Sequence, residues 1–235
     1  MLHRLLIATL ACAALGAADF AWIEGESPTV RPTLPAGLPA DGVRYGDAWG
    51  LSRIMSGGKV LHLNISDGDV DKHVSDGLTF AYDVTLTSGG THEVWARIGY
   101  ESVRSPIRWR VAGGAWQEVA SDRPTQDVQQ IQTWNELAWA KFGVIETKPG
   151  ATRLEIQWPR PQRKDGDQIK VERILGILDA WCIAAPGVFQ PSGRWKPGED
   201  QRGDAEQAAA ALIFKLPEPS AAGERGAVAL NGTWE

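Results

Sequence analysis

Short segments in which apolar and polar side chains alternate run through most of this chain, and this pattern constrains the fold more than any other feature. The clearest covers residues 78–86, where apolar side chains occupy every second position from Leu78 to Leu86. A period of two places successive side chains on opposite faces of a β-strand. Similar segments, bounded by Gly, Pro, Asp and Ser, follow at 91–100, 107–112, 115–119, 136–146, 151–158 and 171–183. Helical periodicity is nearly absent, so the sequence predicts an all-β fold, an antiparallel β-sandwich.

The turns between these segments predict which of them pair. Ser88-Gly89-Gly90 joins the first two segments, and Gly113-Gly114 joins the next two. Glycine pairs tolerate the positive φ values of tight hairpin turns. We therefore expect two antiparallel hairpins.

The segment at 171–183 differs from the others because it is apolar almost throughout. A strand of that composition is buried on both faces. Cys182, inside it, is expected to be a small core residue. Asp179 is the single acid between Ile174 and Ile183, and it needs a partner because an isolated buried charge is costly.

The first 18 residues predict a secretory signal peptide. His3 and Arg4 precede an apolar run from Leu5 to Ala17, and small residues lead to a cleavage site near Ala18. The run is too short to span a bilayer. We expect a secreted or periplasmic chain, with lipid attachment at Cys12 as the alternative.

The charge balance argues against a nucleic-acid partner. The chain has 24 Lys and Arg against 29 Asp and Glu, a net charge of −5 and a pI of about 5.5, whereas nucleic-acid-binding domains are usually basic. With 43% hydrophobic and 23% charged residues, it is expected to be neither disordered nor embedded in a membrane.

The composition changes after residue 186. Pro, Gly and charged residues from 187 to 220 predict a linker, within which residues 205–214 suit a short helix or a strand equally. Residues 221–235 look like the opening of another strand and turn. We therefore expect one β-sandwich module at 19–186, a linker, and the start of a truncated second domain.

Two carboxylates lie on one face of the first expected strand. Alternation places Glu24 and Glu26 side by side. Their repulsion raises one pKa unless a cation lies between them, and a hard cation such as Ca²⁺ suits the pair. The alternative is an edge strand with two solvated glutamates. If Asp179 lies beside this strand, the three acids form one oxygen cluster, although an arginine such as Arg173 or Arg53 would satisfy Asp179 equally well.

Two further groups of charged residues have ordinary interpretations. Arg97, Arg108 and Arg110 are expected on outward strand faces, either as a site for an acidic polysaccharide or as a solvated face. Residues 67–71 resemble the start of a calcium loop, but Lys72 and Leu78 stand where an EF-hand needs glycine and glutamate. A polar connector is therefore predicted there.

No catalytic constellation is visible in the sequence. His62, His73 and His92 form no HExxH motif, and there is neither a Gly-x-Ser-x-Gly elbow nor a phosphate-binding glycine loop. Glu24 and Glu26 point together, whereas carboxylates that cleave a glycosidic bond flank it from opposite sides. A non-catalytic module is therefore expected.

Four short motifs occur in a recognisable order. They are Trp22-Ile23-Glu24-Gly25-Glu26, Ser56-Gly57-Gly58, the pair of segments 76–84 and 90–97, and residues 177–181. They resemble the opening Glu-x-Glu strand, the Ser-Gly-Gly turn, the central hairpin and the closing strand of calcium-containing β-sandwich carbohydrate-binding modules. These modules have the galactose-binding-like jelly-roll fold, and families 6 and 35 are the most similar. The resemblance implies that Asp179 joins Glu24 and Glu26 at a structural calcium.

The same resemblance implies a sugar site at the loop end of the sandwich. Tyr100 and Trp134, with Asn135 beside it, match the positions where the family places its aromatic platform, and Trp49 is a third candidate. Such rings stack on the apolar face of a pyranose, although packing in the core is the alternative for each. Ile177 departs from the family, because many sugar-binding relatives carry asparagine there.

Residues 229–235 resemble the first strand of the jelly-roll domain that opens glycoside hydrolase family 2 enzymes. This implies a covalently linked catalytic domain beyond Glu235. The expected function is that of a non-catalytic accessory module of a secreted carbohydrate-active enzyme, with an oligo- or polysaccharide as partner. The alternatives are a structural spacer without ligand and the N-terminal fragment of a glycoside hydrolase.

Overall fold

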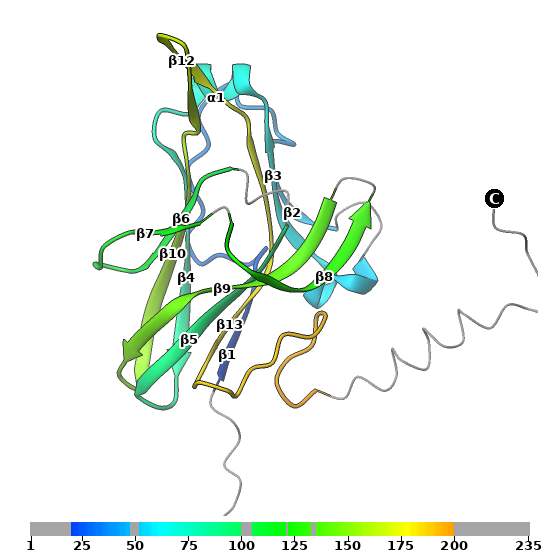
Figure 1. Ribbon diagram of the computed structural model, residues 1–235, viewed down its shortest axis with the longest axis vertical. Coiled ribbons are helices and arrows are strands. Elements are labelled where there is room, and N and C mark those ends of the chain that lie inside the picture. The colour runs from blue at the N-terminus through cyan, green and yellow to red at the C-terminus, as the bar shows by residue number, and fades with distance from the viewer. Residues whose placement is uncertain (1–19, 48–51, 100–104, 121, 133–134, 200–235) are drawn as a thin grey trace, which may run out of the picture. The chain divides into compact units, whose positions relative to one another are not determined.

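The computed structural model describes residues 20–47, 52–99, 105–120, 122–132 and 135–199, with the side chains of residues 131, 132 and 135 left aside. Within these residues the chain forms two antiparallel β-sheets and a separate two-stranded hairpin (Figure 1). The antiparallel β-sandwich predicted from the alternation is confirmed. The predicted signal peptide and residues 200–235 lie outside the described residues, so the division into leader, module, linker and second domain stays a prediction.

The larger sheet has seven strands. They are β1 (Phe20–Glu24), β2 (Val43–Gly46), β3 (Val60–Ile65), β5 (Gly90–Gly99), β8 (Thr125–Gln132), β9 (Asn135–Thr147) and β13 (Ile174–Ala184). Their order is β2, β3, β13, β5, β9, β8, and β1 also pairs with β13. On one edge of β13, β3 lies beside the first half and β1 beside the second half, while β5 lies along the other edge. β13 is therefore the central strand.

The smaller sheet has four strands in the order β4, β10, β6, β7. They are β4 (Gly77–Leu86), β6 (Ile107–Val111), β7 (Gln117–Val119) and β10 (Gly150–Pro159). The separate hairpin consists of β11 (Gln162–Asp165) and β12 (Gln168–Val171). Helical elements are the α-helix α1 (Asp67–His73) and the short 3-10 turns η1 (Ser52–Ile54) and η2 (Ser56–Gly58).

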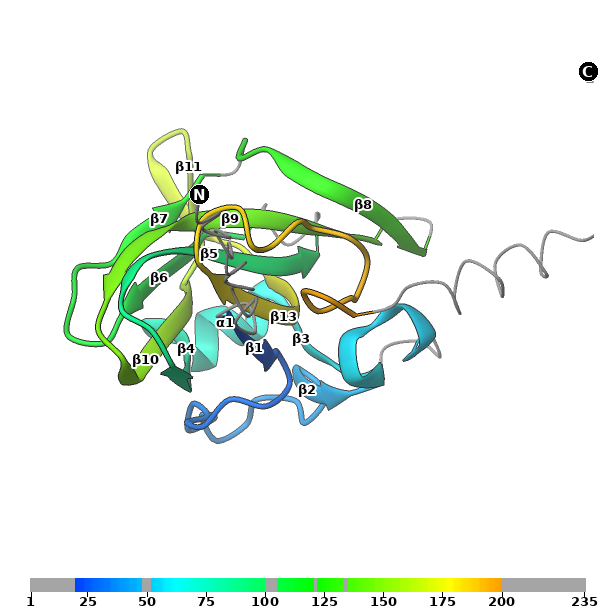
Figure 2. The same cartoon turned by 90° about the horizontal axis from the view of Figure 1, so that it is seen from below.

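The main hydrophobic core lies between the two sheets (Figure 2). The predicted inward face of β4 is confirmed, because Phe80 and Tyr82 are both 0% exposed. Phe80 packs edge-on against Trp158 of β10, with ring centroids 5.8 Å apart, and Tyr82 packs against Trp181 of β13 at 6.0 Å. Each aromatic side chain that is fully buried stabilises the fold by about 1.5–3 kcal/mol, so these contacts hold the two sheets together.

The expected hairpin between residues 78–86 and 91–100 is wrong. β4 pairs with β10, whereas β5 pairs with β9 and β13, so the chain crosses from one sheet to the other between β4 and β5. The reason is burial on both sides of β5, where neighbouring Val94 and Trp95 are 0% and 7% exposed. Such a strand belongs inside a covered sheet. The β6–β7 hairpin across Gly113-Gly114 is confirmed.

The outer face of the large sheet is also covered. Ala180 and Cys182 of β13 pack there against Trp22, Trp139 and Phe189. Phe189 comes from residues 185–195, which we call the cover segment. Trp139 Nε1 donates a hydrogen bond of 2.8 Å to a carbonyl of this segment, at Gly193. The predictions of a strand buried on both faces and of a core thiol at Cys182 are therefore confirmed, with the strand beginning at Ile174.

Residues 67–71, predicted as a polar connector, instead lie in α1. The side chain of Ser66 accepts a hydrogen bond of 3.2 Å from the backbone N–H of Asp69 and so caps the helix. Asp67 and Asp69 in the first turn suit the positive end of the helix dipole. Among the described residues, no helix has the length and apolar character needed to cross a membrane.

Candidate functional site

Asp179 lies at a break in the strand pairing of the large sheet. β1 ends opposite Ala180 and β3 begins beside Leu178, so Asp179 is level with the gap between them. On the other edge, the register against β5 shifts between Leu178 and Ala180, which marks a β-bulge. Leu178 faces the main core and Ala180 the outer face, although a regular strand would place both on one side. A bulge re-aims side chains in this way.

Two donors hold the buried Asp179 carboxylate. Arg97 Nη1 donates to Oδ2 at 2.8 Å, and the backbone N–H of Ser56 donates to Oδ1 at 2.9 Å. The side chains of Asp179 and Arg97 are both 0% exposed. Burial, with a contribution from Glu24, raises the pKa of Asp179 to about 7, while Arg97 and the Ser56 N–H oppose the rise.

Arg97 is the partner of Asp179, in place of the Arg53 or Arg173 that the sequence suggested. Arg173 donates instead to Asn64 Oδ1 at 2.8 Å. The expectation of an outward Arg97 is wrong, because the face of β5 that carries it is covered. Its guanidinium also donates to the Ile54 carbonyl at 2.7 Å and to Gln129 Oε1 at 2.6 Å. The sequence signal that could have revealed this burial is the position of Arg97 between the apolar residues Ala96 and Ile98.

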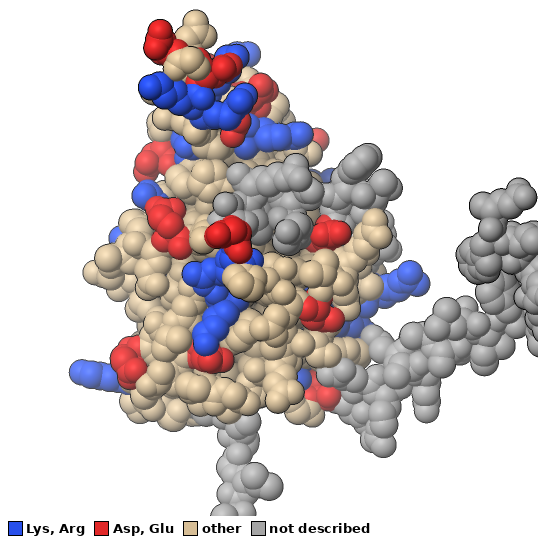
Figure 3. Space-filling view, viewed as in Figure 1, with Lys and Arg blue, Asp and Glu red and all other residues tan. Residues whose placement is uncertain are grey.

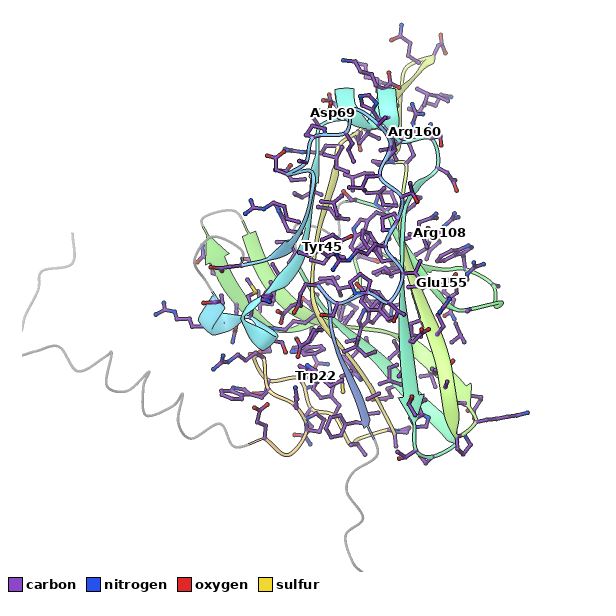
Figure 4. All side chains as sticks on the ribbon, turned by 180° about the vertical axis from the view of Figure 1, so that it is seen from behind. Trp22, Tyr45, Asp69, Arg108, Glu155 and Arg160 are labelled. Atoms are coloured by element: carbon purple, nitrogen blue, oxygen red, sulfur yellow. The ribbon has the colours of Figure 1, made fainter. Side chains whose placement is uncertain are left out.

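Glu24 and Glu26 each keep one buried carboxylate oxygen, Oε2, without a hydrogen-bond partner among the described residues. The other oxygen of Glu24 accepts a hydrogen bond of 3.2 Å from Trp22 Nε1 and lies 3.7 Å from Lys196 Nζ. Figure 4 shows Trp22 on β1, beside the chain that follows β13. Burial raises the pKa of Glu26 and the charge of Glu24 adds to this, while its own backbone N–H and Lys59 oppose it.

Two glycines let the segments of this site approach one another. A Cβ on Gly25 would lie 2.1 Å from the carbonyl oxygen of Leu178, so only glycine fits between the two glutamates. Its backbone N–H donates to the Asp179 carbonyl at 2.7 Å. Gly57 has φ +57° and lies against the Glu24 carboxylate, so that a Cβ on Gly57 would lie 3.4 Å from Glu24 Cδ. The opening strand, the Ser-Gly-Gly turn and the closing strand therefore meet at one place.

The carboxylate oxygens of Glu24, Glu26 and Asp179 meet some of the requirements of a site for a hard cation. The two partnerless Oε2 atoms are acceptors of the kind that Ca²⁺ uses. Each Asp179 oxygen already accepts one hydrogen bond, although a carboxylate oxygen has a second lone pair. Within the part of the chain described, no three His, Cys, Asp or Glu residues form a group that could hold a metal ion.

Three of the four predicted sugar-binding residues, Trp49, Tyr100 and Trp134, lie outside the described residues. Asn135 begins β9, and its side chain is likewise undescribed. The strand ends next to these positions are neighbours: Gly99, the last residue of β5, pairs with Leu137, and Gln132 of β8 pairs with Asn135.

Ile177 lies on the outer face of β13, in an apolar cluster with Met55, Val60 and Leu137. It is 2% exposed. An amide-bearing side chain at this position would meet apolar neighbours. Ile177 is therefore a packing residue of this cluster.

Most described tryptophans serve the cores. Trp109, Trp139, Trp158 and Trp181 are each 0% exposed. In the described part of the chain, tryptophan is thus chiefly a packing residue, and the sequence alone did not separate packing rings from surface rings.

Arg108 and Arg110 lie on the outer face of the small sheet, as predicted. They donate to Gln157 Oε1 and Glu155 Oε2, both at 2.5 Å. Figure 4 shows Arg108 and Glu155 directed away from the core on this side of the molecule. Both guanidinium groups also lie over the ring of Trp116, at 5.0 and 4.2 Å. Arg110 is paired with an acid and Arg108 is held by a neutral amide, and this local bonding favours the solvated-face interpretation.

Comparison with known proteins gives likeness in structure only. No family model matches the chain, and no curated protein matches it. A solved structure of a GH26-CBM35 β-(1,4)-mannanase from Podospora anserina matches over 75% of this chain, with 11% identity and a TM-score of 0.42. The present chain spans 31% of the length of that enzyme.

Two isolated modules are similar at the same level. A carbohydrate-binding module (CBM6cm-2) from Cellvibrio mixtus lichenase 5A, in complex with cellotriose, matches over 70% of this chain and 96% of its own, with 13% identity and a TM-score of 0.38. A CBM35 from Cellvibrio japonicus Abf62 matches over 71% and 93%, with 10% identity and a TM-score of 0.36. Likeness at this level says nothing of what the present chain binds.

Proposed function

We propose that this chain is a secreted, non-catalytic carbohydrate-binding module that serves a covalently linked carbohydrate-active enzyme. The ligand is an oligo- or polysaccharide, held at the loop end of the sandwich by Trp49, Tyr100, Trp134 and Asn135. The aromatic rings cover the apolar C–H face of a pyranose, and the Asn135 amide binds a hydroxyl group.

One observation carries this proposal: the ends of β5, β8 and β9 next to Tyr100, Trp134 and Asn135 are neighbours in one sheet. Gly99, which precedes Tyr100, pairs with Leu137, two residues after Asn135. Segments that leave adjacent strand ends are well placed to share one ligand, and rigid strands that position loops are a usual basis of binding sites.

We further propose a structural calcium held by Glu24 and Glu26, with Asp179 as the third carboxylate. Support comes from the two buried oxygens without partners and from the raised pKa of Glu26. A cation would offset the cost of burying these charges. Arg97 would then fix Asp179 from the opposite side.

A spacer without ligand is the second candidate, and Ile177 favours it. This side chain is buried among apolar residues at a position that commonly contributes a hydrogen bond to sugar. A module that has lost this group retains the fold but lacks part of the usual site.

Sugar binding is tested by titration calorimetry of the purified chain with neutral oligosaccharides, using Trp134→Ala and Tyr100→Ala as variants. The matched control is Trp116→Ala, the same change on the outer face of the small sheet. We expect saturable binding that weakens about tenfold or more in the two variants and is unchanged in the control. If the folded protein shows no detectable binding of neutral or acidic sugars, the result would support the spacer.

Calcium is tested by thermal unfolding with saturating Ca²⁺ and with chelator. At a free concentration of 100 times Kd, a cation bound only to the folded state contributes about 2.7 kcal/mol, a shift of roughly 5–10 °C for a chain of this size. Glu26→Gln should abolish the difference, whereas Glu146→Gln, at an exposed strand position, should keep it. Identical melting curves with and without chelator would exclude the site.

A further inference from the structure

A groove lies at the edge of the large sheet, where the pairing of β8 with β9 begins. The first β8 residue, Thr125, pairs with Ala140, and within the described residues no strand lies along this edge of β9 beyond that point. The groove has a volume of about 740 Å³ and is lined by apolar surface from Trp95, Pro124 and Phe142. We call it the edge groove. Its size and its largely apolar lining suit a small-molecule ligand.

Arg123 brings an unbalanced positive charge to the edge groove. It is half-buried, and its Nη1 donates to the backbone carbonyl of Lys141. A guanidinium has five N–H donors, and this bond uses one. None of the ion pairs among the described residues includes Arg123, and burial lowers its pKa without an acidic side chain to offset the effect.

Lys141 lines the same groove and is fixed in place. Its Nζ donates to Glu93 Oε1 at 2.5 Å, and Trp95 Nε1 donates to Glu93 Oε2 at 3.1 Å. The charge of Glu93 is therefore offset by Lys141, and no ion pair joins Glu93 to Arg123 in the described part of the chain. The acidic side chain that lines the groove is Asp122, which is exposed at the rim. Figure 3 shows a compact group of basic side chains over the β9 region of this face, with acidic side chains beside it.

We propose that the edge groove binds the oxyanion of an acidic saccharide, either a carboxylate or a sulfate ester. Arg123 donates two parallel hydrogen bonds to the oxyanion, a geometry that a planar guanidinium offers and an ammonium does not. Lys141, which is paired with Glu93, lines the same groove beside Arg123. The sugar ring lies with its apolar face against the exposed Pro124.

This site is separate from the loop-end site, although its assignment to a saccharide rests on the proposed function. The loop-end site is proposed at the start of β9, near Asn135, whereas the edge groove adjoins Lys141 to Gly143 further along the strand. A module with both sites would hold a polysaccharide at two points, which raises its effective affinity without new contacts at either.

The test is calorimetry on the whole chain with three probes of equal length. They are tetragalacturonate, its full methyl ester, and a κ-carrageenan tetrasaccharide that carries sulfate but no carboxylate. We expect at least one charged probe to bind, the methyl ester to bind much more weakly, and added salt to reduce the affinity. Which charged probe binds distinguishes the carboxylate from the sulfate source.

Variants identify the groove. Arg123→Gln should weaken binding of the charged probe roughly tenfold to hundredfold, since a charge-assisted hydrogen bond is lost. Gln126→Glu, which adds a negative charge at the exposed rim, should also weaken it. The matched control is Arg153→Gln, which removes an arginine from an exposed pair with Asp83 on the other sheet and should change nothing.

Three results would overturn the proposal: equal binding of the methyl ester, full affinity in folded Arg123→Gln, or no binding of either charged probe at millimolar concentration. Trp134→Ala separates this proposal from the loop-end site. Loss of charged-probe binding in Trp134→Ala but not in Arg123→Gln would assign the oxyanion to the loop end and refute the edge groove. If a charged probe binds in a way that depends on Arg123 and no neutral sugar binds, the loop-end site alone is refuted.

Discussion

Replacing Asp179 by asparagine removes one charge from the buried pair with Arg97 and keeps the shape of the side chain. Both partners are 0% exposed, so the remaining guanidinium has no access to water. Breaking such a pair from one side costs about 3–5 kcal/mol. Arg97 keeps the Ile54 carbonyl and Gln129 as acceptors, which offsets part of the loss. We therefore expect the lower end, about 3 kcal/mol.

The assay is urea unfolding followed by tryptophan fluorescence, in chelator so that a cation does not contribute. The pH should be 8, because the pKa of Asp179 is raised to about 7 and the carboxylate must be ionised. The single variants Asp179→Asn and Arg97→Met should each lose stability at an unchanged m-value. The double variant Arg97→Met with Asp179→Asn should lose less than the sum of the two, because no charge is left buried. A loss below about 1 kcal/mol in Asp179→Asn, or strict additivity in the double variant, would refute the reasoning.

Three further perturbations test other parts of the molecule. Gly176→Ala places a Cβ 2.6 Å from Trp158 Nε1 and should cost about 1–3 kcal/mol by overpacking; an unchanged melting temperature would contradict this contact. Cys182 is fully buried, and burial raises its pKa to about 12. The thiol of the native protein should therefore resist Ellman's reagent at pH 8. A reaction as fast as that of the protein unfolded in urea would show that the core is open. Burial and then Arg44 lower the pKa of His62 to about 4. In the unfolded chain His62 takes up a proton near pH 6.5, whereas in the folded chain it stays neutral down to about pH 4. The free energy of unfolding should therefore fall by up to about 3 kcal/mol between pH 6.5 and 4. Urea titrations at several pH values should show a weaker pH dependence in His62→Gln, and an identical pH dependence would exclude His62 as its source.

The strands themselves could be predicted from the sequence, but their partners could not. The inward face of β4 follows from local alternation, because the period of a strand is a property of its own residues. That β4 pairs with β10 rather than β5 depends on which strand is covered on both faces, and a turn such as Ser88-Gly89-Gly90 carries no information about that.

One part of the candidate site, the buried carboxylate, could be predicted because a charged residue inside an apolar strand is visible in the sequence. The sequence identifies Asp179 as a buried carboxylate in need of a partner, and the structure supplies Arg97. Alternation predicts an outward Arg97, because it distinguishes two faces but does not say that a distant segment covers the second. Ile54 and Gln129, whose oxygens accept hydrogen bonds from Arg97, are remote in sequence from β5 and leave no local pattern in the strand.

The cover segment also determines how mechanical load would enter the sandwich. Tension applied to the chain beyond Glu199 reaches Lys196, whose Nζ lies 3.7 Å from Glu24 Oε1, and then Gly193, whose carbonyl is bonded to Trp139. It then reaches Phe189, which is wedged edge-on against Trp139 with ring centroids 4.7 Å apart. Pulling must withdraw this ring from between its neighbours before any force acts on the end of β13. The central strand is thereby shielded from being peeled away from its C-terminal end.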